Sequence, residues 1–221
     1  MYSPSTLPLL GLLGFALLIL FALLEVGVIE AAYQKLGMSH RAVTGLLMLS
    51  IFGSYINISL TAIAARGLPH DRVIIVDGME NVLPRVQAAG HTIIAVNLGG
   101  AVIPILLSGY LLWRVGGFLP TLVATAAVSA VVHRFSRVVP GVGIAVPTFI
   151  PGVVAAILAS ILDRRRSASV AYVAGTIGCL VGADLMNLGA LWRLHARIAT
   201  IGGAGTFDSV FVSGIIAVLL A

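Results

Sequence analysis

Long apolar runs alternate with short polar segments along the whole chain. A run of about 20 apolar residues can cross the hydrocarbon core of a bilayer as a helix. We place such segments at about Leu7–Ile29, Ala42–Ala64, Thr92–Trp113, Phe118–Val132, Val142–Leu162, Ser169–Leu191 and Thr206–Ala221. The fourth is short, and either crosses at a thin place or only dips into the bilayer. The pattern predicts an all-α membrane protein, a polytopic bundle of about six or seven transmembrane helices in one integral membrane domain over residues 1–221.

Two kinds of interruption break this pattern. Residues 66–91 form the longest polar stretch, and VIIVDG (Val73–Gly78) within it is a β-like run that ends in a turn dipeptide. It predicts a small extramembrane connector, folded as a hairpin or a re-entrant loop. Glycine and proline also lie inside apolar runs and predict broken helices, at Gly99, Gly100, Pro104, Pro147 and Pro151.

The composition agrees with a membrane location. Apolar residues make up 59% of the chain, charged residues only 10%, and the mean hydropathy is +1.10. A soluble domain carries about 25% charged residues. The first charged residue is Glu25, so the first run lacks the basic segment of a cleaved signal peptide. We therefore expect a multi-pass membrane protein, in contact with membrane lipids.

The charged and metal-ligating residues restrict the partners. The net charge is +5, but the basic residues lie mostly between the apolar runs and form no stripe with interleaved aromatics, so no nucleic-acid partner is expected. The single cysteine and the histidine spacing predict no metal site and no cofactor. Alternating spans would bring Lys35, Arg41, Arg114 and the triplet Arg164–Arg166 to one side. The triplet is expected to anchor the topology and bind anionic headgroups.

Two aspartates inside the last two spans are the strongest candidates for chemistry. An ionised carboxylate at the bilayer centre costs roughly 3 kcal/mol, so such residues tend to be functional. Asp184 lies about two turns before the end of the sixth span, and Asp208 lies in the first turn of the seventh. Because consecutive spans run antiparallel, both carboxylates are predicted at similar depth. A close pair shares one proton and can activate water, as in aspartic proteases.

The surroundings of this predicted pair suggest how a substrate could reach it. Gly202, Gly203 and Gly205 precede Asp208 and leave room for a substrate backbone or a partner helix to approach. Asn187 follows Asp184 by one turn of helix. Pro147 and Pro151 are assigned to the same site, as a broken helix near the substrate.

Two resemblances follow from these motifs. GGAGTFDSVFVSG resembles the GxGD segment of presenilin-type and prepilin-type intramembrane aspartyl proteases, although Thr206 and Phe207 separate Asp208 from Gly205. That resemblance implies a catalytic dyad of Asp184 and Asp208 and transmembrane protein substrates. The chain as a whole resembles an uncharacterised family of prokaryotic membrane proteins, domain of unknown function 1614, which implies no activity. The segments that carry this second resemblance are VNLGGAVIP, VPTFIPG, GADLMNL and GGAGTFD.

Other functions use the same residues differently. Asp208 fits a helix start capped by Thr206, and Asp184 fits a structural hydrogen bond to Asn187 or a neighbouring helix. In an ion-coupled transporter or channel, the two aspartates would form the ion site between broken helices. In a non-catalytic scaffold they would be structural. The sequence leaves these alternatives, and assembly into a homo-oligomer, open.

Overall fold

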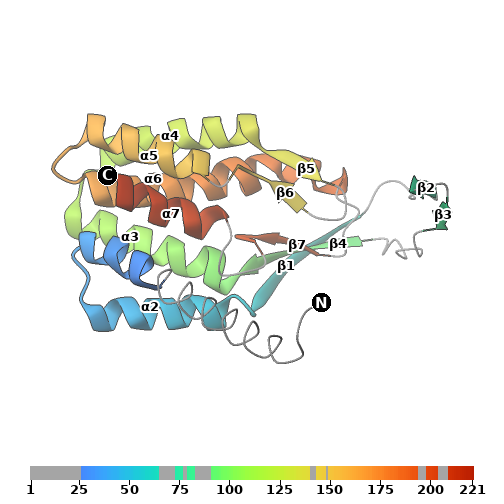
Figure 1. Ribbon diagram of the computed structural model, residues 1–221, viewed down its shortest axis with the longest axis horizontal. Coiled ribbons are helices and arrows are strands. Elements are labelled where there is room, and N and C mark those ends of the chain that lie inside the picture. Colours follow the sequence, from blue (N-terminus) through green and yellow to red (C-terminus); the bar gives the residue numbers. More distant parts are fainter. Residues whose placement is uncertain are drawn as a thin grey trace, which may run out of the picture.

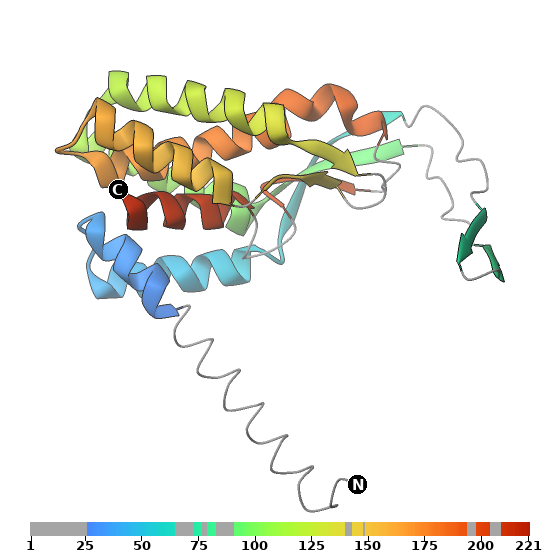
Figure 2. The ribbon, with the colours of Figure 1, turned by 45° about the horizontal axis from the view of Figure 1, so that its top comes forward.

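Antiparallel helices make up most of the fold (Figures 1 and 2). The computed structural model describes residues 26–64, 73–76, 79–82, 91–139, 143–147, 149–193, 198–203 and 209–221. Residues 26–35 are helical. The α-helices that follow are α2 (His40–Gly53), α3 (Ile103–Val115), α4 (Phe118–Phe135), α5 (Phe149–Leu162), α6 (Ser167–Cys179) and α7 (Ser209–Leu220). Most of the predicted first span lies outside the described residues.

Short strands lie at one end of the helices. A three-stranded sheet has the order β1-β4-β7, in which β4 pairs antiparallel with β1 and parallel with β7. Two antiparallel strand pairs, β2–β3 and β5–β6, accompany it. The strands are β1 (Asn57–Ala64), β2 (Val73–Val76), β3 (Met79–Val82), β4 (His91–Asn97), β5 (Arg137–Val139), β6 (Gly143–Ala145) and β7 (Ile198–Ile201). The hairpin expected in the polar connector is therefore confirmed.

The sheet corrects the all-α prediction. The second predicted span, Ala42–Ala64, divides into α2 and β1, and the third, Thr92–Trp113, begins as β4. Both strand segments are rich in isoleucine and threonine, whose branched side chains favour strands. The fifth span likewise begins with β6 and becomes helical only at Phe149. The fourth, predicted to be short, forms a helix of 18 residues.

Three helical segments of the described chain are long and apolar enough to cross a membrane: Leu98–Val115, Phe118–Phe135 and Ser167–Gly189. Helices α5 and α7 are apolar but shorter. Large apolar side chains point outward from α3, α4 and α5, including Leu106, Leu119 and Ile161, each about 70% exposed. So much exposed apolar surface indicates contact with lipid rather than water. These features indicate a membrane protein, and the count of six or seven spans stays a prediction.

Helices α6 and α7 form the centre of the bundle. Gly175 of α6 brings the backbones close, because a Cβ built there would lie 3.1 Å from Ala217 Cβ on α7. The hydroxyl of the buried Ser213 lies 2.9 Å from Gly175 O and from Val210 O. Small residues and hydroxyls of this kind hold membrane helices together.

Removing the Ser213 hydroxyl should loosen this contact. We expect Ser213→Ala to lower the free energy of unfolding by about 1 kcal/mol, because the Gly175 carbonyl loses an interhelical donor. Ser160→Ala on the exposed face of α5 is the matched control. Thermal unfolding in detergent, followed by circular dichroism, measures both. Equal unfolding temperatures for the two variants would contradict this role.

The end of the bundle opposite the sheet gathers basic side chains. Lys35 Nζ donates to Leu219 O at 2.8 Å, and Arg114 Nη1 donates to Gly37 O at 3.2 Å. A Cβ built on Gly117 would lie 3.4 Å from Arg166 Nη1. These contacts confirm that Lys35, Arg114 and the arginine triplet share one side. We call Lys35, Arg114, Arg164, Arg165 and Arg166 the arginine end.

Candidate functional site

Asp184 lies where the sixth span changes its helical form. After α6 the chain continues as a π-helical turn, η2 (Leu180–Asp184), and then as a 3-10 helix, η3 (Leu185–Arg193). Turns of π-helix within α-helices occur frequently at functional sites. Asp184 is partly buried, and its Oδ2 accepts a hydrogen bond of 2.8 Å from the Gly202 backbone N–H. The predicted catalytic aspartate is thus joined to the glycine segment that precedes α7.

Gly202 and Gly203 form a turn after β7 that only glycine readily adopts. Their φ angles are +81° and +68°, in the left-handed region. A Cβ on Gly202 would also lie 2.5 Å from Ala101 Cβ. Ala101 belongs to a second π-helical turn, η1 (Leu98–Val102), which leads from β4 into α3. The Asp184–Gly202 bond therefore lies beside the π-helical turn that begins another apolar helix.

Asn97, the last residue of β4, connects the sheet with the helices. Its side chain is fully buried, and its Oδ1 accepts from Gly100 N at 2.7 Å. Its Nδ2 donates to Ser54 O at 2.7 Å and to Asn57 Oδ1 at 3.0 Å. One amide group therefore caps η1, holds the end of α2 and pairs with the first residue of β1.

Backbones cross here with almost no space between them. A Cβ on Gly99 would lie 2.1 Å from Ser50 O, and a Cβ on Gly100 would lie 2.0 Å from Gly202 O. A Cβ built on Gly53 would lie 3.0 Å from Gly99 N. We call Gly53, Gly99, Gly100 and Gly202 the glycine junction. It brings α2, η1 and the turn after β7 into contact, next to Asp184.

The other predicted site residues are distributed around this junction. Asn187 points to the end of α4, with its Nδ2 at 2.9 Å from Ser136 Oγ and 2.8 Å from Ala183 O. Pro151 is buried in the first turn of α5, whereas Pro147 is exposed between β6 and α5. Gly205 and Asp208 lie outside the described residues. Ser209, which follows Asp208, has its Oγ 3.8 Å from Cys179 Sγ on α6.

The chemistry available at this site is that of carboxylate, amide and backbone groups. Within the described residues, no group of three or more His, Cys, Asp or Glu side chains gathers closely enough to hold a metal ion. An ionised Asp184 can accept a proton or a cation, and the Gly202 N–H orients it. The nearby backbone carbonyls of Ser54 and Gly202 are further acceptors.

Asn97 and Ser54 were not among the predicted site residues. The signal for them was a polar asparagine followed by Leu-Gly-Gly inside an apolar run. We interpreted Gly99 and Gly100 as a helix break, but the pattern did not indicate which segment crosses there. That segment is the turn at Gly202, about 100 residues further along the chain.

With its apolar helices and outward-facing apolar side chains, this molecule is of the membrane-protein class. The chain belongs to the family described as "Protein of unknown function (DUF1614)", whose model matches residues 51–220. The resemblance to that family is therefore confirmed, and the match includes Asn97, Asp184 and Asp208. No curated protein and no solved structure matches the chain.

Proposed function

We propose that this protein is an intramembrane aspartyl protease of a GxGD-like type, with Asp184 and Asp208 as its catalytic dyad in a prokaryotic cell membrane. One observation carries the proposal: the Asp184 carboxylate accepts the Gly202 N–H at 2.8 Å. This bond joins the aspartate of the sixth span to the glycine segment that leads to Asp208. The resemblance of that segment to the GxGD motif is the second support.

The packing of α6 on α7 also favours a pair. Ser209, next to Asp208 in the chain, lies against Cys179 of α6. Asp184 follows Cys179 by five residues, which is roughly 7 Å along the helix at about 1.5 Å per residue. Two aspartate side chains that face each other can close such a gap, directly or through one water.

In the proposed mechanism the two carboxyl groups have different roles. Asp184, whose carboxylate is oriented by the Gly202 N–H, is the base that takes a proton from water. Protonated Asp208 gives its proton to the carbonyl oxygen of the substrate as the water oxygen bonds to the carbonyl carbon. The tetrahedral intermediate collapses when Asp184 passes the proton taken from water to the amide nitrogen, the C–N bond breaks, and Asp208 takes a proton back from the hydroxyl group as the carbonyl forms again. No metal or cofactor enters these steps.

The substrates proposed are transmembrane helices of other proteins. A peptide bond in a helix must be freed from its backbone hydrogen bonds before water can attack it. The glycine junction is filled by its own backbone, so the proposed approach is at Gly203, which follows Gly202 and is only partly buried. An unwound substrate segment could bond to backbone groups there within the membrane.

The test is cleavage by the purified full chain in liposomes, with a panel of single-span reporter proteins and mass spectrometry of the products. We expect Asp184→Asn and Asp208→Asn each to lower the rate by on the order of a thousandfold or more, because the dyad acts as a unit. Asp163→Asn is the matched control. Its ion pair with Arg166 is long, at 3.4 Å, and lies at the arginine end.

Circular dichroism of each variant separates loss of catalysis from loss of folding. Full activity of either dyad variant would exclude the mechanism, as would an equal loss in Asp163→Asn. Cleavage outside the transmembrane segment of the reporters would remove the intramembrane assignment.

One observation favours ion-coupled transport as a second candidate. The sixth span is interrupted by the π-helical turn η2, which contains Asp184, and the span of α3 begins with the π-helical turn η1 beside Gly202. Secondary transporters hold coupling ions at interrupted helices near buried carboxylates. In the same liposomes, ion flux that depends on Asp184, without cleavage of any reporter, would favour this candidate over the protease.

A further inference from the structure

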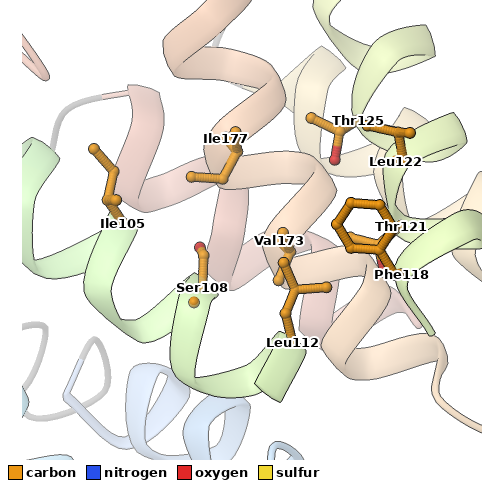
Figure 3. Close-up of a pocket in the computed structure, with 10 residues that line it drawn as sticks. Ile105, Ser108, Leu112, Phe118, Thr121, Leu122, Thr125, Val173 and Ile177 are labelled. Atoms are coloured by element: carbon orange, nitrogen blue, oxygen red, sulfur yellow. The ribbon is translucent and has the colours of Figure 1, made fainter. Parts of the chain in front are cut away.

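A groove opens on the outer face of the bundle, between α3 and α4 (Figure 3), and Asp184 is not among its lining residues. Both helices pack on α6, which forms the floor of the groove. Its volume is about 290 Å³. Side chains from all three helices line it, among them Ile105, Leu112, Phe118, Leu122, Val173 and Ile177.

Two of the three hydroxyl groups that line this groove are already used within their own helical segments. Ser108 Oγ donates to Pro104 O at 2.8 Å, and Thr121 Oγ1 donates to Gly117 O at 2.7 Å. Apart from the Thr125 hydroxyl, the groove presents mainly methyl, methylene and ring carbons to an occupant. Gly109 lies along the same wall, and a Cβ built there would meet no heavy atom within 4 Å. Such a surface suits a flexible hydrocarbon chain.

The groove reaches the arginine end of the bundle. Phe118 lines it, and the preceding Gly117 lies against Arg166, whose Cδ and Nη1 are 3.4 Å from a Cβ built on that glycine. Arg164 and Arg165 are exposed next to Arg166. Within the described residues, Asp163 pairs with Arg166 at a distance of 3.4 Å. The three adjacent arginines therefore carry more positive charge than this one carboxylate neutralises. A positive group at the mouth of an apolar groove is complementary to an anionic amphiphile.

We infer that this groove binds one anionic phospholipid, with an acyl chain between α3 and α4 and its phosphate-bearing headgroup at Arg166 and the neighbouring arginines. Hydrophobic burial holds the chain, and the arginines select the headgroup by charge. The inference assumes that α3, α4 and α6 span a membrane. It does not depend on the aspartate dyad, because Asp184 lies beyond the opposite end of α6.

The experiment uses the full chain in phosphatidylcholine nanodiscs that contain a small fraction of phosphatidylglycerol with a photoreactive diazirine on one acyl chain. After illumination, mass spectrometry locates the lipid adducts. We expect adducts concentrated on peptides of α3 and α4, and fewer when the reactive lipid is phosphatidylcholine. Gly109→Leu, which fills the groove without a backbone clash, should remove most of them. Gly45→Leu on α2 is the matched control, because its added Cβ also meets nothing within 4 Å.

The headgroup site has its own variant. Arg166→Gln should lower the preference for phosphatidylglycerol over phosphatidylcholine about fivefold, the effect expected of one basic residue near a membrane surface. Arg41→Gln removes the same charge from α2 and should leave the preference unchanged. The Asp184→Asn variant should be labelled by the lipid to the same extent as the wild type. The lipid inference therefore stands even if the protease proposal fails.

Three outcomes would overturn the inference: adducts spread evenly over the exposed faces of α3, α4 and α5, equal labelling by the two lipids, or undiminished labelling of Gly109→Leu. If the groove instead holds a helix of a second copy, bifunctional crosslinking would join chains through α3 and α4. Lipid adducts would then be absent from the groove, and the lipid assignment would be wrong.

Discussion

Gly100→Ala is expected to destabilise the protein by about 3 kcal/mol, at the upper end of the range for overpacking a folded interior. The added methyl group would lie 2.0 Å from the Gly202 carbonyl oxygen, closer than any nonbonded carbon–oxygen contact allows. This neighbour is backbone, so it cannot swing aside as a flexible side chain can. Relief requires the turn at Gly202 to move, which strains its hydrogen bond to Asp184. The unfolding temperature in detergent, measured by circular dichroism, tests this.

The matched control is Gly109→Ala, where the added methyl group meets no atom within 4 Å. It lies within α3, where alanine is a better helix former than glycine, so a small gain of up to about 1 kcal/mol is expected. Similar unfolding temperatures for Gly100→Ala and the wild type would mean that the glycine junction is looser than the contacts indicate. Gly99→Ala, facing Ser50 O at 2.1 Å, should behave like Gly100→Ala.

The apolar pattern predicted where the helices lie better than where they end. Helices α4 and α7 begin and end within a few residues of predicted spans, and the sixth predicted span corresponds to α6 together with η2 and η3. The strands β1 and β4 were predicted as parts of helices. The run Ile93–Val96 of β4 is apolar throughout and shows no period, whereas β1 alternates polar and apolar residues from Asn57 to Ala62, a strand pattern that the apolar run before it outweighed. The clearest clue was the pair of asparagines, Asn57 and Asn97, which face each other in the β1–β4 register. A single sequence cannot show such a pairing across 40 residues.

The candidate site was predictable in part. An aspartate within an apolar run is costly enough to indicate Asp184 from sequence alone. The glycines before Asp208 indicated a close approach, and the Gly202–Asp184 hydrogen bond is such an approach. The crossing at Gly99 and Gly100 could not be predicted, because it depends on β7 joining the sheet beside β4. Parallel pairing of β4 with β7 brings segments about 100 residues apart to the same place.

Asn97→Leu is expected to lower the free energy of unfolding by about 2–5 kcal/mol. Leucine has a similar size but cannot replace the three hydrogen bonds of the buried amide. The Gly100 N–H and the Ser54 carbonyl would be left without this partner in a place with little access to water. Each buried polar group that loses its partner costs about 1–3 kcal/mol. Thermal unfolding in detergent measures the loss.

Two further variants assign the effect to particular bonds. Asn57→Leu removes only the bond between the two side chains at an exposed position, so a loss below about 1 kcal/mol is expected. Asn97→Asp keeps an acceptor for Gly100 N but loses the donor to Ser54 O, so its stability should be lower than that of the wild type. If Asn57→Leu were as destabilising as Asn97→Leu, the strand pairing rather than the cap of η1 would be the main contribution. Because η1 itself contacts Gly202, whose N–H is bonded to Asp184, a loss confined to Asn97 would connect the stability of the sheet to the position of Asp184.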